Sequence, residues 1–175
     1  GRMLAIEARR MGYQVVQWVG GPDSGSARLS DWFIEEPFDC SETLEKFLQA
    51  VDVVTVEFEN IPSSLLRAVE EKRPLYPSAF AIETSQHRER EKRFLEEKGI
   101  PCAPFAVITS ADELREANQD LPGEKRVLKT AEFGYDGKGQ LSIDKQADAD
   151  QVWEQFSSPR AVLEQKIDLA GELSV

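Results

Sequence analysis

The stretch Gly134-Tyr135-Asp136-Gly137-Lys138-Gly139-Gln140 connects two segments, 126–130 and 140–143, whose residues favour β-strands. A tight hairpin needs only one or two glycines, and Asp136-Gly137 alone would suit a type I′ turn. This stretch has three glycines, which let backbone N–H groups approach an anion closely, and Lys138 adds a positive charge. It therefore predicts either a plain hairpin or a loop that covers phosphate groups.

The spacing of these glycines separates the stretch from the two best-known phosphate loops. A dinucleotide-binding fingerprint has a different spacing and leads into a helix, whereas a predicted strand follows here. A Walker A loop closes with Gly-Lys-Ser or Gly-Lys-Thr, and neither closes this stretch. A phosphate-covering role would therefore belong to a loop of a different class.

Charged residues on the neighbouring strands strengthen the second interpretation. Lys129 lies five residues before Gly134 and is either a solvated strand residue or a point charge directed at phosphates. Glu164 lies on a later predicted strand, and Glu172 follows eight residues further on. These carboxylates are either exposed or hydrogen-bonded to adenine and to ribose hydroxyls. The order of lysine strand, glycine stretch and Glu-Gln-Lys-Ile strand favours an ATP site.

Helices and strands alternate in the first half of the chain. The sequence patterns predict helices over 3–11, 41–50 and 60–72, the second capped by Ser41, and strands over 13–19, 33–34, 51–57 and 75–76. This alternation predicts an open, doubly wound α/β sheet with parallel strands. Ligands of such sheets bind at the carboxyl ends of the strands, which is where Glu57, Glu59 and Asn60 lie.

The pattern changes near residue 84, where we place a boundary between domains 1–84 and 85–175. A helix over 86–98 is strongly charged, and its residues Glu89 and Arg93 form an i,i+4 pair. The other expected elements are helices over 78–84, 110–118 and 147–156, the middle one with a capping box of Ser110 and Glu113, and strands over 105–108, 126–130, 140–143, 161–167 and 172–175.

Composition excludes some function classes. The formal net charge of −11 disfavours nucleic acid as a partner, and no stretch approaches the roughly 20 apolar residues of a membrane span. Cys40 and Cys102 lie far apart, so we expect two reduced thiols and a cytoplasmic location rather than a disulfide. His87 does not form a zinc motif with these cysteines.

Four segments of the second half together resemble the ATP-grasp domain of the N5-carboxyaminoimidazole ribonucleotide synthetase family: Val127-Leu128-Lys129, the glycine stretch, Glu164-Gln165-Lys166-Ile167 and Gly171-Glu172-Leu173-Ser174. The first half is similar to the same family. Gly1-Arg2-Met3-Leu4 resembles the end of its G-x-G-Q-L-G-R-M-L opening, and residues 53–62 resemble its T-x-E-F-E-N-[VI]-P segment. The resemblance implies an α/β chain. A doubly wound, parallel-sheet pre-ATP-grasp domain without its first strand would precede the first part of an α+β ATP-grasp domain.

The resemblance also implies a reaction. The family joins bicarbonate to the amine of 5-aminoimidazole ribonucleotide in purine biosynthesis, using ATP to form carboxyphosphate and releasing ADP and phosphate. The implied triphosphate contacts are Arg88, Lys129 and Gly134 to Gln140, and the implied adenine and ribose contacts are Glu164, Gln165, Lys166, Ile167 and Glu172. Tyr135 and Asp136 would lie near the amine and the bicarbonate, and Glu57, Glu59 and Asn60 would face the ribonucleotide.

Further expectations follow from the same resemblance. The family's acidic Mg²⁺ ligands are expected beyond residue 175, so we expect this chain alone to be inactive, and we expect a homodimer at full length. The alternatives are another ATP-grasp ligase, of the formate-dependent glycinamide ribonucleotide transformylase or biotin carboxylase type, and a non-catalytic nucleotide-binding module. The pair Tyr135-Asp136 favours the carboxylating ligase.

Overall fold

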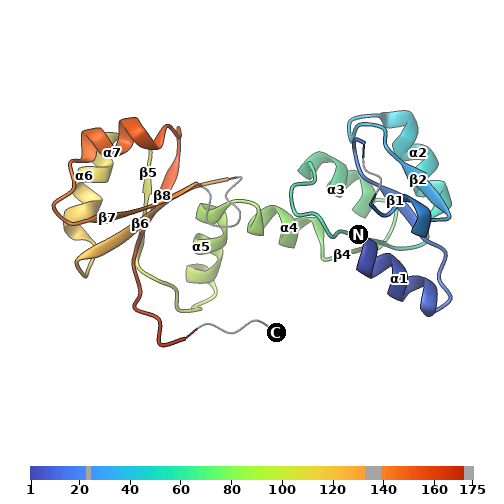
Figure 1. The fold of residues 1–175 in the computed structure, drawn as a ribbon, viewed down its shortest axis with the longest axis horizontal. Helices are drawn as coiled ribbons and strands as arrows, with labels where there is room; N and C mark the ends of the chain where they lie inside the picture. The colour runs from blue at the N-terminus through green and yellow to red at the C-terminus, as the bar shows by residue number, and fades with distance from the viewer. Residues whose placement is uncertain (23–24, 133–138, 172–175) are drawn as a thin grey trace. The chain divides into compact units, whose positions relative to one another are not determined.

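The computed structural model describes residues 1–22, 25–132 and 139–171 of the chain. The chain divides into two compact units, Gly1–Glu83 and Thr84–Val175 (Figure 1). Within the described residues, no helix is both long enough and apolar enough to cross a membrane.

Two short pairs of parallel strands form the sheets of the first unit. The strand β1 (Val16–Trp18) pairs with β2 (Trp32–Ile34), and β3 (Val54–Thr55) pairs with β4 (Leu75–Tyr76). The helical elements of this part of the chain are α1 (Arg2–Arg10), η1 (Ala27–Leu29), α2 (Ser41–Ala50), α3 (Ser63–Glu70) and α4 (Ala79–Ser85). Parallel strands alternating with helices confirm the predicted α/β class, although the described strands form two separate pairs rather than one sheet.

The predicted strand over 51–57 is wrong in length, since β3 contains only Val54 and Thr55. Its partner explains the difference. The strand β4 lies between Pro74 and Pro77, and proline has no N–H with which to continue a ladder. Val53, outside the pair, is 55% exposed despite its apolar side chain. The run of valines therefore overstates the strand.

The other boundaries of the first unit differ less. The strand predicted over 13–19 is limited to Val16–Trp18. The predicted cap of the second helix is wrong by one residue, because Ser41 is the first helical residue and Cys40 precedes it with extended backbone. The core of the unit is formed by α3 and its neighbours, through Leu65, Leu66, Val69, Leu75, Ala79 and Ile82.

A four-stranded antiparallel sheet forms the second unit. Its order is β5 (Phe105–Ile108), β8 (Ala161–Gln165), β6 (Lys125–Thr130) and β7 (Gln140–Asp144). The helices α6 (Ala111–Asp120) and α7 (Ala149–Phe156) lie on one face, and α5 (Arg88–Glu97) lies on the other (Figure 1). These elements confirm the predicted helices and strands between 86 and 167, with ends that differ by at most two residues.

The two faces of this sheet differ in chemistry because side chains alternate along each strand. Ile108, Leu128 and Leu163 are fully buried and pack with Leu114 of α6 in an apolar core. Full burial of each such side chain stabilises the fold by roughly 1.5–3 kcal/mol. The intervening residues of the strands point to the opposite face, which α5 covers, and they include charged side chains. We call this the α5 face.

The start of α6 confirms the predicted cap. The Ser110 hydroxyl accepts a hydrogen bond from the Glu113 N–H at 3.2 Å. The Glu113 carboxylate accepts from the Thr109 hydroxyl and N–H, one residue earlier than in a standard capping box. These bonds, that of the Thr109 hydroxyl first, hold the pKa of Glu113 below its usual range. The side chains thus fix the turn between β5 and α6.

A buried arginine connects the end of α6 to β6. Arg126 has no exposed surface, and its guanidinium donates to the carbonyl oxygens of Leu121 and Gly123. Carbonyl groups at the end of a helix lack partners within the helix and attract positive charge. Arg126 therefore joins this connection to the sheet.

Candidate functional site

Three of the predicted site residues lie on the α5 face of the sheet. Glu164 of β8 is opposite Val127 of β6, and Lys129 follows Val127 by two residues, so both charged side chains point to the same side. Lys129 is in turn opposite Gln140 of β7, which places Gln140 on that side as well. The sheet therefore brings together residues that are 11 to 35 positions apart in the chain.

Glu164 forms ion pairs with two lysines. One oxygen of its carboxylate, Oε2, lies 3.0 Å from Lys129 Nζ and 3.4 Å from Lys92 Nζ of α5. The side chains of Lys92, Lys129 and Glu164 are only 11%, 23% and 10% exposed. The interpretations of Lys129 as a solvated lysine and of Glu164 as an exposed carboxylate are therefore wrong. We call these three residues the lysine–glutamate cluster.

Arg88 begins α5, and its backbone N–H donates to the Ala131 carbonyl at 2.9 Å. His87 precedes it, with Nε2 3.7 Å from the Glu132 carboxylate. The start of α5 is thus attached to the residues that follow β6, next to the glycine stretch in the chain. Arg88 is half-buried there.

The described part of the glycine stretch contains Gly139 and Gln140, whereas Gly134, Tyr135, Asp136, Gly137 and Lys138 lie outside the described residues. Gly139 has φ +71°, a conformation that side chains disfavour. A Cβ at this position would also lie 2.7 Å from the Thr130 hydroxyl. The Thr130 N–H donates to the Gly139 carbonyl at 2.8 Å, so the close approach belongs to the strand pairing itself.

The segment predicted to contact adenine, 164–167, does not direct all of its side chains to the same face of the sheet. Gln165 is opposite Arg126, so its side chain points away from the α5 face and lies near Gly123. Its N–H donates to the Pro104 carbonyl, and the Lys166 N–H donates to the Lys125 carbonyl. Ile167 is 48% exposed. The structure does not bring the Gln165 side chain to Glu164, and Glu172 lies outside the described residues.

The predicted ribonucleotide contacts lie in the first unit, after β3. Glu57 and Glu59 are exposed and Asn60 is half-buried. The Glu57 carboxylate lies 2.6 Å from the Gly1 nitrogen. The segments that resemble the family's opening and its E-F-E-N motif are thus neighbours within this unit.

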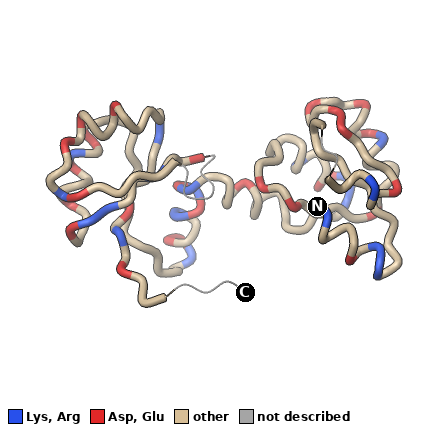
Figure 2. The backbone as a smooth tube through the Cα atoms, in the orientation of Figure 1, with Lys and Arg blue, Asp and Glu red and all other residues tan. Residues whose placement is uncertain are grey.

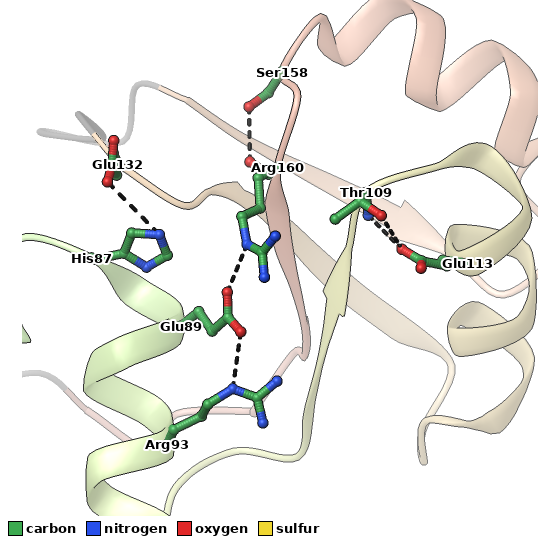
Figure 3. Close-up of polar contacts among 8 residues, drawn as sticks. All are labelled: His87, Glu89, Arg93, Thr109, Glu113, Glu132, Ser158 and Arg160. Atoms are coloured by element: carbon green, nitrogen blue, oxygen red, sulfur yellow. Dashed lines mark hydrogen bonds and ion pairs between the residues drawn. The ribbon is translucent and has the colours of Figure 1, made fainter.

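The helix α5 carries acidic and basic residues along its whole length (Figure 2). Glu89 lies between Arg160, at the start of β8, and Arg93, with N···O distances of 2.7 and 2.9 Å (Figure 3). The pair of Glu89 with Arg93 confirms the sequence prediction. The hydrogen bond from Arg160, with a second from Arg93, lowers the pKa of Glu89 to about 2. This carboxylate attaches α5 to the sheet.

The low pKa of Glu89 predicts how stability depends on pH. A carboxylate whose pKa is lower in the folded protein stabilises it above the unfolded-state pKa, and this stability is lost as the pH falls through the folded-state pKa. We expect Glu89→Gln to lower the free energy of unfolding by about 2 kcal/mol at pH 7, since both arginines are partly exposed. Urea denaturation from pH 7 down to about 2 should show the wild type and the variant converging. Glu91→Gln, on an exposed position of the same helix, is the control, and a constant difference across this range would contradict the assignment.

Lys92 and Arg160 were not predicted from the sequence as partners of these carboxylates. A signal for Lys92 was present, because it follows Arg88 by four residues and therefore lies on the same side of the helix. No local signal exists for Arg160, which is 71 positions from Glu89. Cys40 and Cys102 are free, as predicted.

A metal site in this structure would need several ligand side chains grouped around one point. Among the residues that it describes, no three histidine, cysteine, aspartate or glutamate side chains lie close enough together to hold a metal ion. The Mg²⁺ ion that the resemblance implies therefore has no fitting set of ligands among them.

Comparisons with known proteins agree with this geometry. Residues 1–86 match the ribonucleotide synthetase preATP-grasp domain, and residues 93–175 match the ATP-grasp domain. The N5-carboxyaminoimidazole ribonucleotide synthase of Brucella melitensis is 35% identical over the whole chain, which covers 49% of that protein. The chain thus spans about half the length of the curated relatives it matches.

Two solved structures are similar over nearly all of the chain. The N5-carboxyaminoimidazole synthetase of Staphylococcus aureus, complexed with ADP, has a TM-score of 0.87 at 30% identity, with 95% of this chain and 44% of that one covered. The Aspergillus clavatus enzyme, in complex with ADP and 5-aminoimidazole ribonucleotide, has a TM-score of 0.77 at 25% identity, with 94% and 43% covered. The chain therefore belongs to the ATP-grasp superfamily, in the group with a ribonucleotide synthetase preATP-grasp domain, and its relatives there are the N5-carboxyaminoimidazole ribonucleotide synthetases.

Proposed function

We propose that the protein containing this chain carboxylates 5-aminoimidazole ribonucleotide with bicarbonate in purine biosynthesis. The products are N5-carboxyaminoimidazole ribonucleotide, ADP and phosphate. The observation that carries the proposal is the placement of Lys129, Gln140 and Glu164 on one face of the sheet, in a chain whose relatives are named for this product. The similar Aspergillus clavatus structure holds ADP and 5-aminoimidazole ribonucleotide, which are a product and a substrate of this reaction.

The nucleotide would bind on the α5 face. Lys129 would place its positive charge against the phosphates, because phosphoryl transfer depends mainly on positioning and charge neutralisation. Residues 134–140 would cover the phosphates, and Arg88 would contact them from the start of α5. Glu164 to Ile167 would line the adenine and Glu172 the ribose. The N–H groups of Gln165 and Lys166 already donate to backbone carbonyls, so adenine would bind to other groups of this segment.

Bicarbonate and 5-aminoimidazole ribonucleotide are the other two substrates of the proposed reaction. Bicarbonate is a poor electrophile, and its phosphorylation supplies a leaving group that releases CO₂ next to the amine. Tyr135 and Asp136 would lie near the bicarbonate and the amine, and Glu57, Glu59 and Asn60 would bind the ribonucleotide. Mg²⁺ would neutralise phosphate charge when bound, through ligands that the described residues do not group together. We also propose that the protein forms a homodimer and is located in the cytoplasm.

The test uses the complete gene product. Phosphate release from ATP is expected only when both 5-aminoimidazole ribonucleotide and bicarbonate are present. With ¹⁸O-labelled bicarbonate, one label is expected in the released phosphate, since carboxyphosphate transfers a bicarbonate oxygen. Turnover that requires formate and glycinamide ribonucleotide, or biotin in place of 5-aminoimidazole ribonucleotide, would instead assign a different ATP-grasp ligase. Nucleotide binding without turnover under any of these conditions would favour a binding module.

A further inference from the structure

The lysine–glutamate cluster has more positive charge than its carboxylate needs. Glu164 is buried and contacts two ammonium groups through one oxygen, at 3.0 and 3.4 Å. A buried carboxylate is stable with one well-placed cation, and removal of its last partner is strongly unfavourable. The second lysine is therefore not needed to stabilise the Glu164 carboxylate.

The proposed function gives this second positive charge a role, and the inference rests on that function. If Lys129 binds a phosphate, its ammonium group must share or leave its contact with Glu164. Glu164 would then stay buried with only the partner on α5. We propose that Lys92 is a positioning residue, which holds the Glu164 carboxylate and compensates its charge while Lys129 turns to the nucleotide phosphates.

The surroundings of Lys92 suit a fixed partner. Its side chain is 11% exposed, and its ammonium group lies 5.3 Å from the centre of the Phe105 ring, within the range of a cation–π contact. Phe105 is directly opposite Glu164 in the neighbouring strand, so the ring and the carboxylate together determine where this ammonium group lies. Lys129 has no such ring contact among the described residues and is twice as exposed.

The helix that carries Lys92 is itself attached to the sheet through two contacts at its first turn. The Arg88 N–H donates to the Ala131 carbonyl beyond the end of β6, and Glu89 pairs with Arg160 at the start of β8. These contacts come from residues three and four positions before Lys92, about one helical turn away. Lys92 is therefore held in place when the partners of Lys129 change.

A double-mutant cycle on nucleotide affinity tests the inference, with ADP as the probe and calorimetry on the complete gene product. Lys92→Met is expected to weaken ADP binding about tenfold, because Lys129 must then remain with Glu164. Lys92→Arg, which keeps the charge, is expected to restore most of the affinity. In a Glu164→Gln background, Lys92→Met is expected to change affinity less than about twofold, because the charge to be compensated is gone.

Other results would overturn the inference. Equal losses in both backgrounds would mean that Lys92 acts on the nucleotide directly or through the fold, and no loss in the wild-type background would remove its role. Arg90→Met, at an exposed position of the same helix, is the matched control, and Lys92→Gln serves if the methionine variant does not fold. Failure of the wild type to bind ADP would instead reject the proposed function, which separates the two ideas.

Discussion

Replacement of Lys129 by methionine is expected to lower kcat/KM for ATP by about 100-fold in the complete gene product, the range found when a donor to developing charge is removed. Methionine is one atom shorter than lysine, so it keeps most of the apolar packing of the side chain and removes the charge. Glu164 retains Lys92 as a partner at 3.4 Å, so the fold should tolerate the change. Steady-state kinetics with varied ATP at saturating second substrates measures the effect.

The strand itself offers the control for this prediction. Lys125 lies on the same strand and the same side as Lys129, but it is exposed and four residues away from the cluster. Lys125→Met should leave kcat/KM within about twofold of the wild type, as exposed substitutions usually have small effects. Equal kinetics of the two variants would mean that Lys129 is only a structural partner of Glu164.

The largest effect on stability is expected for Glu164→Leu. This substitution leaves the ammonium groups of Lys92 and Lys129 buried side by side without a counter-charge. Removal of one partner of a buried ion pair typically lowers the free energy of unfolding by about 3 to 5 kcal/mol. Hydrogen exchange of the amides in β6 and β8 measures the loss in the second unit.

A second substitution distinguishes the effect of unpaired charge on stability from the effect of packing. If unpaired charge causes the loss, adding Lys92→Met to Glu164→Leu should restore part of the protection, because an apolar replacement of a buried pair is often neutral. Glu154→Gln, at an exposed position of α7, should leave exchange unchanged. A double variant that is less stable than Glu164→Leu would show that packing around residue 164, rather than charge, determines the loss.

The sequence predicted the second unit better than the first, and the reason is physical. Strands such as 126–130 have long antiparallel partners on both sides, so their apolar pattern and their pairing agree. The valine-rich run over 51–57 has a partner of only two residues, which Pro74 and Pro77 limit. The length of a strand depends on its neighbour, which its own residues do not reveal.

The residues of the candidate site also differ in how far the sequence alone predicted them. Lys129, Gly139 and Glu164 could be predicted as site residues because each lies in or beside a strand with a recognisable pattern. Lys92 and Arg160 were missed because their partners are 72 and 71 positions away and only the folded sheet brings them together. Gln165 was placed with Glu164 by adjacency in sequence, although neighbouring strand residues point to opposite faces.

The alternation along β6 has a consequence for how this part of the chain can change during evolution. Arg126 and Leu128 point into the core side, while Val127 and Lys129 point to the α5 face. A slip of one residue would turn the lysine into the apolar core and the leucine toward the charges, so the register is strongly specified by the strand itself. The pairing of β6 with β7 therefore does not depend on the length of the connection between them. Insertions and deletions in this connection should therefore leave the register of β6 in the sheet unchanged.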